Sequence, residues 1–144
     1  MRYLRGPIVA LLAFVIGVAI SPIRFYAEGM GCGRVIDGGG GFSITSYTSS
    51  YFVRLSFAHS GYVSTEKANQ VFGQHLGEAV RVVEHTPKFN KAGTLVGQRA
   101  VAVFFDAETN QYYAAAFWTD GRFLHSIHSS SYLHVIEFEK RNVD

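Results

Sequence analysis

The hydrophobic residues form one continuous run near the N-terminus and periodic patterns over the rest of the chain. Residues Gly6 to Ile23 are eighteen consecutive positions without a charged side chain. As a helix they would be about 27 Å long, which just spans the apolar part of a bilayer. The pattern therefore predicts a single N-terminal transmembrane helix, and residues 1–24 are interpreted as a membrane anchor.

The flanks of this apolar run bear on cleavage and orientation. Arg2 and Arg5 precede it, as in a signal peptide, but Pro22 directly follows the small residues where cleavage would occur. This favours an uncleaved anchor and leaves a secreted soluble domain, released by signal cleavage, as an alternative. Two arginines before the run and only Arg24 shortly after it predict a cytoplasmic N-terminus and an extracytoplasmic domain. In a bacterium this would be an inner-membrane protein with a periplasmic domain.

Glycine dominates the segment that follows. Seven glycines fall between residues 25 and 41, and a backbone of this composition loses much conformational entropy when it is ordered. Residues 25–41 are therefore expected to be a glycine-rich linker. The remaining residues, 42–144, suffice for one compact domain and are too few for two.

A long amphipathic helix is predicted from Ser64 to about His85. Ser64 is a suitable N-cap, apolar residues recur at spacings of three and four, and Pro87 ends the pattern. Gly73 and Gly77 lie within this segment, where small residues would let the helix approach a sheet closely.

The segments on both sides of the helix have strand patterns. Polar and apolar residues alternate from Phe42 to Ala58, which predicts one long strand or a hairpin broken near its middle. After the helix, turn residues separate further strand candidates and indicate an antiparallel meander. The first of these is apolar on both faces, as expected of a central strand. The candidates are Gln98–Phe105, Tyr112–Trp118 and Arg122–His128, and Tyr132–Lys140 favours a short C-terminal helix over a last strand.

Together these elements predict an α+β fold. A small antiparallel sheet of four to five strands would be packed by the one long amphipathic helix, and a single N-terminal transmembrane helix would precede this domain. With only one helix across it, the second face of the sheet would stay partly bare.

Composition and charge exclude some functions. The chain has a net charge of +2, but Arg2, Arg5 and Arg24 belong to the N-terminal segment. Without them ten basic and eleven acidic residues remain, scattered along the sequence, so no basic surface for nucleic acid is indicated. The single cysteine, Cys32, makes an intramolecular disulfide impossible.

Histidines near the C-terminus are the candidates for metal binding. His125, His128 and His134 lie within ten residues of one another, and zinc binds three or four such ligands that converge on one point. On a strand, however, residues three apart point to opposite faces, so His125 and His128 would face one metal only if that stretch were bulged or helical. Ordinary sheet or surface histidines are the alternative.

No catalytic residue, cofactor or cofactor-binding site is assigned from the sequence. Serines at positions 126 and 129–131 lie beside the histidines, but the Gly-x-Ser-x-Gly motif of a nucleophile elbow does not occur. Such serines more often cap or terminate helices and strands. A non-enzymatic role is therefore favoured over an enzyme.

Aromatic residues make up 15% of the chain and concentrate in the predicted strands. Exposed tyrosine and tryptophan are common at protein interfaces, so a sheet face rich in them predicts a docking surface. The equally weighted alternative is that these aromatic residues fill the core and the edge of a small sandwich. The residues assigned to this interaction face are Tyr112, Tyr113, Phe117, Trp118 and Phe123.

The leading hypothesis is thus a membrane-anchored protein that contacts the membrane through residues 6–23 and whose domain is an interaction module or accessory subunit. Its partner would be another protein or a second copy of the chain. A small membrane-anchored enzyme or metal-binding protein that uses the C-terminal histidines is the alternative.

Overall fold

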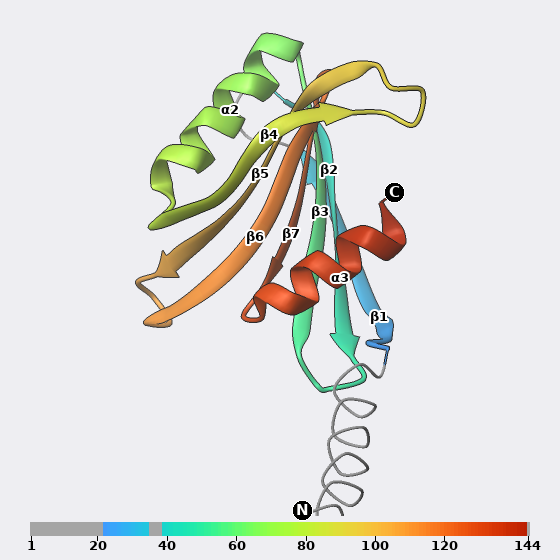
Figure 1. The fold of residues 1–144 in the computed structure, drawn as a ribbon, viewed down its shortest axis with the longest axis vertical. Coiled ribbons are helices and arrows are strands. Elements are labelled where there is room, and N and C mark those ends of the chain that lie inside the picture. The colour runs from blue at the N-terminus through green and yellow to red at the C-terminus, as the bar shows by residue number, and fades with distance from the viewer. Residues whose placement is uncertain (1–21, 35–38, 144) are drawn as a thin grey trace, which may run out of the picture.

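The computed structural model describes residues 22–34 and 39–143, and this part of the chain forms a seven-stranded antiparallel sheet with a helix on each face (Figure 1). In chain order the elements are β1 (Phe25–Arg34), β2 (Gly39–Ser49), β3 (Arg54–Tyr62), α2 (Thr65–Glu78), β4 (Arg81–Phe89), β5 (Leu95–Asp106), β6 (Gln111–Asp120), β7 (Phe123–Ser129) and α3 (Tyr132–Asn142).

Two meanders build the sheet, whose strand order is β1-β2-β3-β7-β6-β5-β4. Strands β1 to β3 form the first meander and β4 to β7 the second. The two join where β3 pairs with β7, with Leu55 opposite Ser129 and Gly61 opposite Phe123. Helix α2 carries the chain from the middle of the sheet to its far edge at β4.

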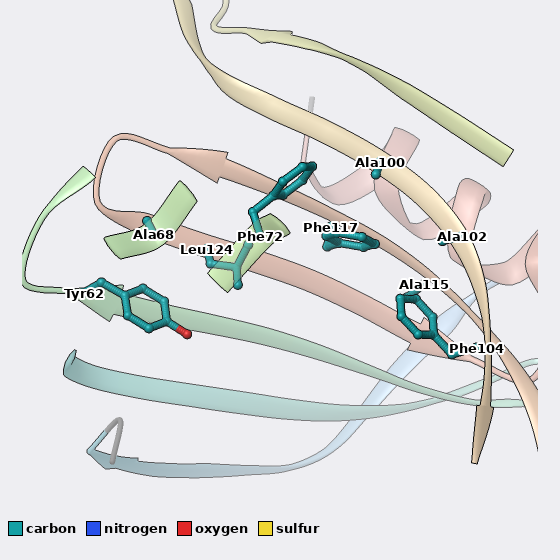
Figure 2. Close-up of a cluster of buried hydrophobic side chains, with 9 residues drawn as sticks. All are labelled: Tyr62, Ala68, Phe72, Ala100, Ala102, Phe104, Ala115, Phe117 and Leu124. Carbon is teal, nitrogen blue, oxygen red and sulfur yellow. The ribbon is translucent and has the colours of Figure 1, made fainter. Parts of the chain in front are cut away.

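One hydrophobic core lies between the sheet and α2. Ala68 and Phe72 are the buried residues of the helix, and Figure 2 shows Phe72 beside Phe117 of β6, with ring centroids 5.1 Å apart. The buried members of this core are Tyr62, Ala68, Phe72, Ala100, Ala102, Phe104, Ala115, Phe117 and Leu124.

A second core lies on the opposite face, under α3. Val135 and Phe138 of the helix are buried against it. The buried members are Leu55, Val101, Ala114, Ala116, Trp118, Ile127, Val135 and Phe138.

An ion pair fastens α3 to the sheet. Glu139 is buried, and its carboxylate accepts hydrogen bonds from Arg99 Nε at 2.5 Å and Nη2 at 2.8 Å. Arg99 Nη1 also donates to Glu84 of β4 at 2.6 Å. These carboxylates raise the pKa of the Arg99 guanidinium, chiefly through the hydrogen bonds from Arg99 to Glu139. A half-buried cation on β5 is thus stabilised by carboxylates from two other elements.

The predicted fold class is wrong in its sheet and in its helix. The sheet has seven strands rather than four to five, and it is covered on both faces. The helix ends at Glu78, because Ala79 is extended and the NH of Val80 donates to the carbonyl of Val103 at 2.9 Å. The β-branched residues that follow pair with β5 as strand β4.

The finer expectations for this helix have different outcomes. Ser64 is the N-cap, and its hydroxyl accepts from the NH of Lys67 at 3.1 Å, which confirms that assignment. The expected close approach of Gly73 and Gly77 to the sheet is wrong, because both are exposed and a β-carbon added at either would meet no atom within 4 Å. Pro87 lies in the edge strand β4, where a residue without an NH is tolerated.

The three strand candidates after the helix are confirmed as β5, β6 and β7 in an antiparallel meander. β5 is an inner strand, paired with β4 on one side and β6 on the other, and its residues enter both cores, as its apolar faces predict. The C-terminal helix is also confirmed as α3. The segment 25–41, expected to be a linker, contains β1 and the start of β2, which pair from Phe25 opposite Ser49 to Arg34 opposite Gly41.

The predicted transmembrane helix, Gly6 to Ile23, lies almost entirely outside the described residues. Within residues 22–34 and 39–143, neither helix has the length and hydropathy needed to cross a bilayer. Ile23, the predicted end of the span, is instead buried in the domain, and its carbonyl accepts a hydrogen bond from Arg141.

We therefore correct the expectation of a signal-anchored, single-pass membrane protein with an extracytoplasmic domain. Arg24, the residue directly after the apolar run, is also part of the fold. Its NH donates to the hydroxyl of Ser50 at 3.1 Å, and its carbonyl accepts from the NH of Ser50 at 2.8 Å.

Gly97 offers a test of how closely β5 and β6 pack. A β-carbon at this position would collide with the backbone carbonyl and the hydroxyl of Thr119. We expect Gly97→Ala to lower the free energy of unfolding by about 2 kcal/mol, since one strand would have to shift. Gly73→Ala, at an exposed position of α2, is the matched control and should stabilise the fold by about 0.5–1 kcal/mol. Urea unfolding of both variants measures the difference, and equal effects would contradict the close packing.

A hollow on the face covered by α2

The predicted metal ligands lie apart in the fold. His125 lies on the sheet face that α3 covers and His128 on the face that α2 covers, while His134 lies on α3 itself. His134 is within 2.8 Å of the hydroxyl of Ser131 and 2.9 Å of the hydroxyl of Ser49, and burial lowers its pKa. In the part of the chain that the structure describes, no three His, Cys, Asp or Glu residues are placed to hold a metal ion.

The predicted interaction face is also divided. Phe117 is buried in the core under α2, whereas Trp118 is buried in the core under α3. Phe123 stacks on His59 on the α3 side, and Tyr113 packs beside the α2 core. Of these five aromatic residues Tyr112 is the most exposed, at 62%.

An open hollow of about 980 Å³ lies on the α2 side of the sheet, toward the C-terminal end of that helix. Figure 1 shows that β2, β3, β5 and β6 extend beyond α2 at this end, toward the bottom of the view. The lining comes from strands of both meanders and from the β5–β6 turn. Its residues include Glu28, Ser46, Arg54, Ser56, Asp106, Glu108, Tyr112, Tyr113, His128 and Ser130.

A ladder of stacked rings leads from the core into this hollow. Phe104 stacks on Tyr113 with centroids 5.3 Å apart, and Tyr113 stacks on His128 with centroids 5.5 Å apart. Burial raises the pKa of Tyr113, and the charges of Asp106 and Glu78 raise it further. The phenol is therefore neutral at physiological pH, and it fixes one side of the His128 ring.

His128 is a neutral imidazole on the wall of the hollow. Burial, with a smaller effect from His75 of α2, lowers its pKa from 6.5 to about 4. None of the side-chain hydrogen bonds among the described residues involves His128, and no fully buried side-chain nitrogen or oxygen there lacks a partner. Neither ring nitrogen of His128 is therefore completely enclosed, and the residue lines the hollow, to which a neutral imidazole can offer one donor and one acceptor.

Arg54 contributes the positive charge of the hollow. It is the first residue of β3, and its carbonyl accepts a hydrogen bond from the hydroxyl of Ser129 at 2.8 Å. Its exposed guanidinium makes no ion pair within the described residues. The carboxylates of the lining belong to Glu28 on β1 and to Asp106 and Glu108 at the β5–β6 turn.

Only some of the residues that line the hollow could be recognised from the sequence. The alternation along β3 places Arg54 and Ser56 on one face, and the sequence patterns single out His128 and Tyr113 for other roles. Nothing local indicates that these residues meet, because Ser56 pairs with His128 from a distant part of the chain.

A second histidine cluster lies on the α3 side. His59 Nδ1 is 2.8 Å from His125 Nδ1, so one of these nitrogens must be protonated and the other not. His125 stacks on Trp118, with centroids 5.2 Å apart. Burial lowers the pKa of His125 to about 4. The charges of His59 and Lys88 lower this pKa further, whereas the charge of Asp120 raises it. The pair links the two meanders at the β3–β7 junction.

No family model matches the chain, and no curated protein and no solved structure matches it either.

The buried imidazole of His128 predicts a dependence of stability on pH. Between pH 6.5 and about 4 the unfolded chain binds a proton at this residue that the folded protein does not bind. Acidification over this range should therefore remove up to about 3 kcal/mol of unfolding free energy at this group. Urea unfolding measures the unfolding free energy of wild type and of His128→Gln from neutral to acidic pH. Because the carboxylates titrate alike in both proteins, the difference between the two pH dependences comes from the imidazole of His128. If the unfolding free energies of the two proteins fell equally with pH, the prediction would be contradicted.

Proposed function

We propose that this domain binds a small organic molecule in the hollow on the α2 side of the sheet. Sites for such ligands are concave, usually about 300–1,000 Å³ in volume, and combine apolar walls with a few polar groups. The hollow, at about 980 Å³, has this size. Tyr113 and His128 give it a flat wall, and serine hydroxyls and Arg54 give it polar groups.

The observation that carries the proposal is the state of His128. A polar ring that is largely buried is normally hydrogen-bonded within the protein. Here the ring is held by stacking on Tyr113 and lines the hollow, while its nitrogens make no hydrogen bond to the described residues. A bound molecule would supply the missing hydrogen bonds.

Binding is favoured over catalysis by the same contacts. Ser56 lies opposite His128 in the sheet, yet no hydrogen bond joins their side chains. A serine nucleophile would need such a bond to its base. The hypothesis of a protein partner stays a prediction, since the aromatic residues that motivate it are divided between the two faces of the sheet.

Filling the hollow tests the proposal. Ser46 of β2 lines the hollow, whereas Ser43 of the same strand points to the opposite face, opposite His59. We expect a library of small aromatic acids, amides and amines to contain molecules that shift the NMR resonances of the His128 ring in wild type. Ser46→Trp should weaken this binding at least tenfold, because the indole would occupy the site.

Ser43→Trp is the matched control and should bind as wild type does. Thermal unfolding of both variants checks that each is folded. The proposal fails if no library member shifts the His128 resonances, or if both tryptophan variants lose binding equally.

A further inference from the structure

We infer that the ligand of the hollow carries an acidic group, a carboxylate or a phosphate ester, which Arg54 binds. This inference rests on the proposed function and adds the charge of the ligand to it. It depends on the position of Arg54 and on the groups around it.

The backbone of Arg54 is fixed by hydrogen bonding and strand pairing, whereas its side chain has no ion-pair partner among the described residues. The hydroxyl of Ser129 donates to its carbonyl at 2.8 Å, and its Cα lies opposite Thr48 of β2. Arg54 lines the hollow, and its guanidinium makes no ion pair with the described residues. A planar guanidinium donates two parallel hydrogen bonds to a carboxylate or phosphate, so its free donors match such a group.

The neighbours of Arg54 on the same face are hydrogen-bond donors. Ser46, Ser56 and His128 lie opposite one another in turn across β2, β3 and β7. The two serines are hydroxyls, and the neutral imidazole has one NH. An anion at Arg54 would therefore be within a set of donors, without a carboxylate next to it in the sheet.

The carboxylates of the lining lie farther along the sheet. Asp106 and Glu108 lie at the end of β5, which is three strand spacings from β3, or about 14 Å. Glu28 lies on β1, two spacings away on the other side, or about 10 Å. Asp106 is also engaged, because its carboxylate accepts from the NH of Glu108 and from the hydroxyl of Thr109, each at 3.0 Å.

The distance between Arg54 and the stacked rings limits the ligand's size. Tyr113 lies on β6, two strand spacings from β3, which is about 10 Å measured across the strands. A molecule that reaches both needs an acidic group at one end and a flat apolar part at the other, with a short connection between them.

Three probes that share a phenyl ring and differ in the charge of their end group test the inference: 3-phenylpropionate, 3-phenylpropionamide and 3-phenylpropylamine. Each is titrated into the full chain at low ionic strength, and binding is measured by calorimetry and by the NMR resonances of His128. We expect the acid to bind at least tenfold more tightly than the amide, and the amine to bind least tightly.

Arg54→Gln should reduce the affinity for the acid to that for the amide and leave the affinity for the amide unchanged. Arg54→Lys should retain part of the preference, because the charge remains and the paired hydrogen bonds are lost. Lys91→Gln removes a positive charge from the exposed β4–β5 loop, away from the hollow, and should leave all three affinities as in wild type.

The outcomes separate this inference from the proposed function. If the three probes bind equally, if the amine binds best, or if Arg54→Gln has no effect, the inference is overturned while binding in the hollow stands. If none of the probes or library members shifts the His128 resonances, the proposed function fails and the inference fails with it.

Discussion

Six consecutive residues of β6, Ala114 to Thr119, are buried, so this strand has no face that could lie against water. Alternate side chains point to opposite faces of a sheet, and here Phe117 enters the α2 core while Trp118 enters the α3 core. Covering only one face would leave the other apolar set exposed. The two helices cover both faces of β6, and the neighbouring strands cover its two sides. The small side chains of Ala114 to Ala116 let the helices on both faces approach the sheet closely. This double burial is the constraint on which the three-layer arrangement depends.

The hollow follows from where α2 stops. A helix of 14 residues is about 21 Å long, whereas the 12 residues of β5 extend over about 40 Å. The chain leaves the helix at Ala79 because it must form β4 along the open edge of β5. The ends of the strands beyond α2 are therefore uncovered on this face. At that place the ring of His128 is buried enough to lose its proton, yet it still faces open space.

The sequence predicts the elements whose signals are local. The meander from β5 to β7, the N-cap at Ser64 and the C-terminal helix all follow from periodicity, capping and turn residues, and Gly121 has the positive φ of +59° that its turn requires. β4 is not predicted because Val80 and Val83 also fit the spacing of the helix, and only the free edge of β5 decides between helix and strand. β1 escapes it because its glycines give no strand pattern. The site could be predicted only in parts, since β3 pairs with β7 from a distant part of the chain.

Phe138 of α3 has a consequence for the order in which the chain can fold during synthesis. Its ring contacts Phe25 of β1, Tyr47 of β2 and Phe57 of β3, with centroids 5.1, 4.9 and 5.7 Å apart. β3 in turn needs β7 as its neighbour in the sheet. A ribosome delivers β1 to β3 before the second meander and α3, so the residues that cover and flank the first three strands follow later in the chain. The first meander is thus stabilised only after the second, so the nascent domain carries an incomplete sheet until α3 has been translated.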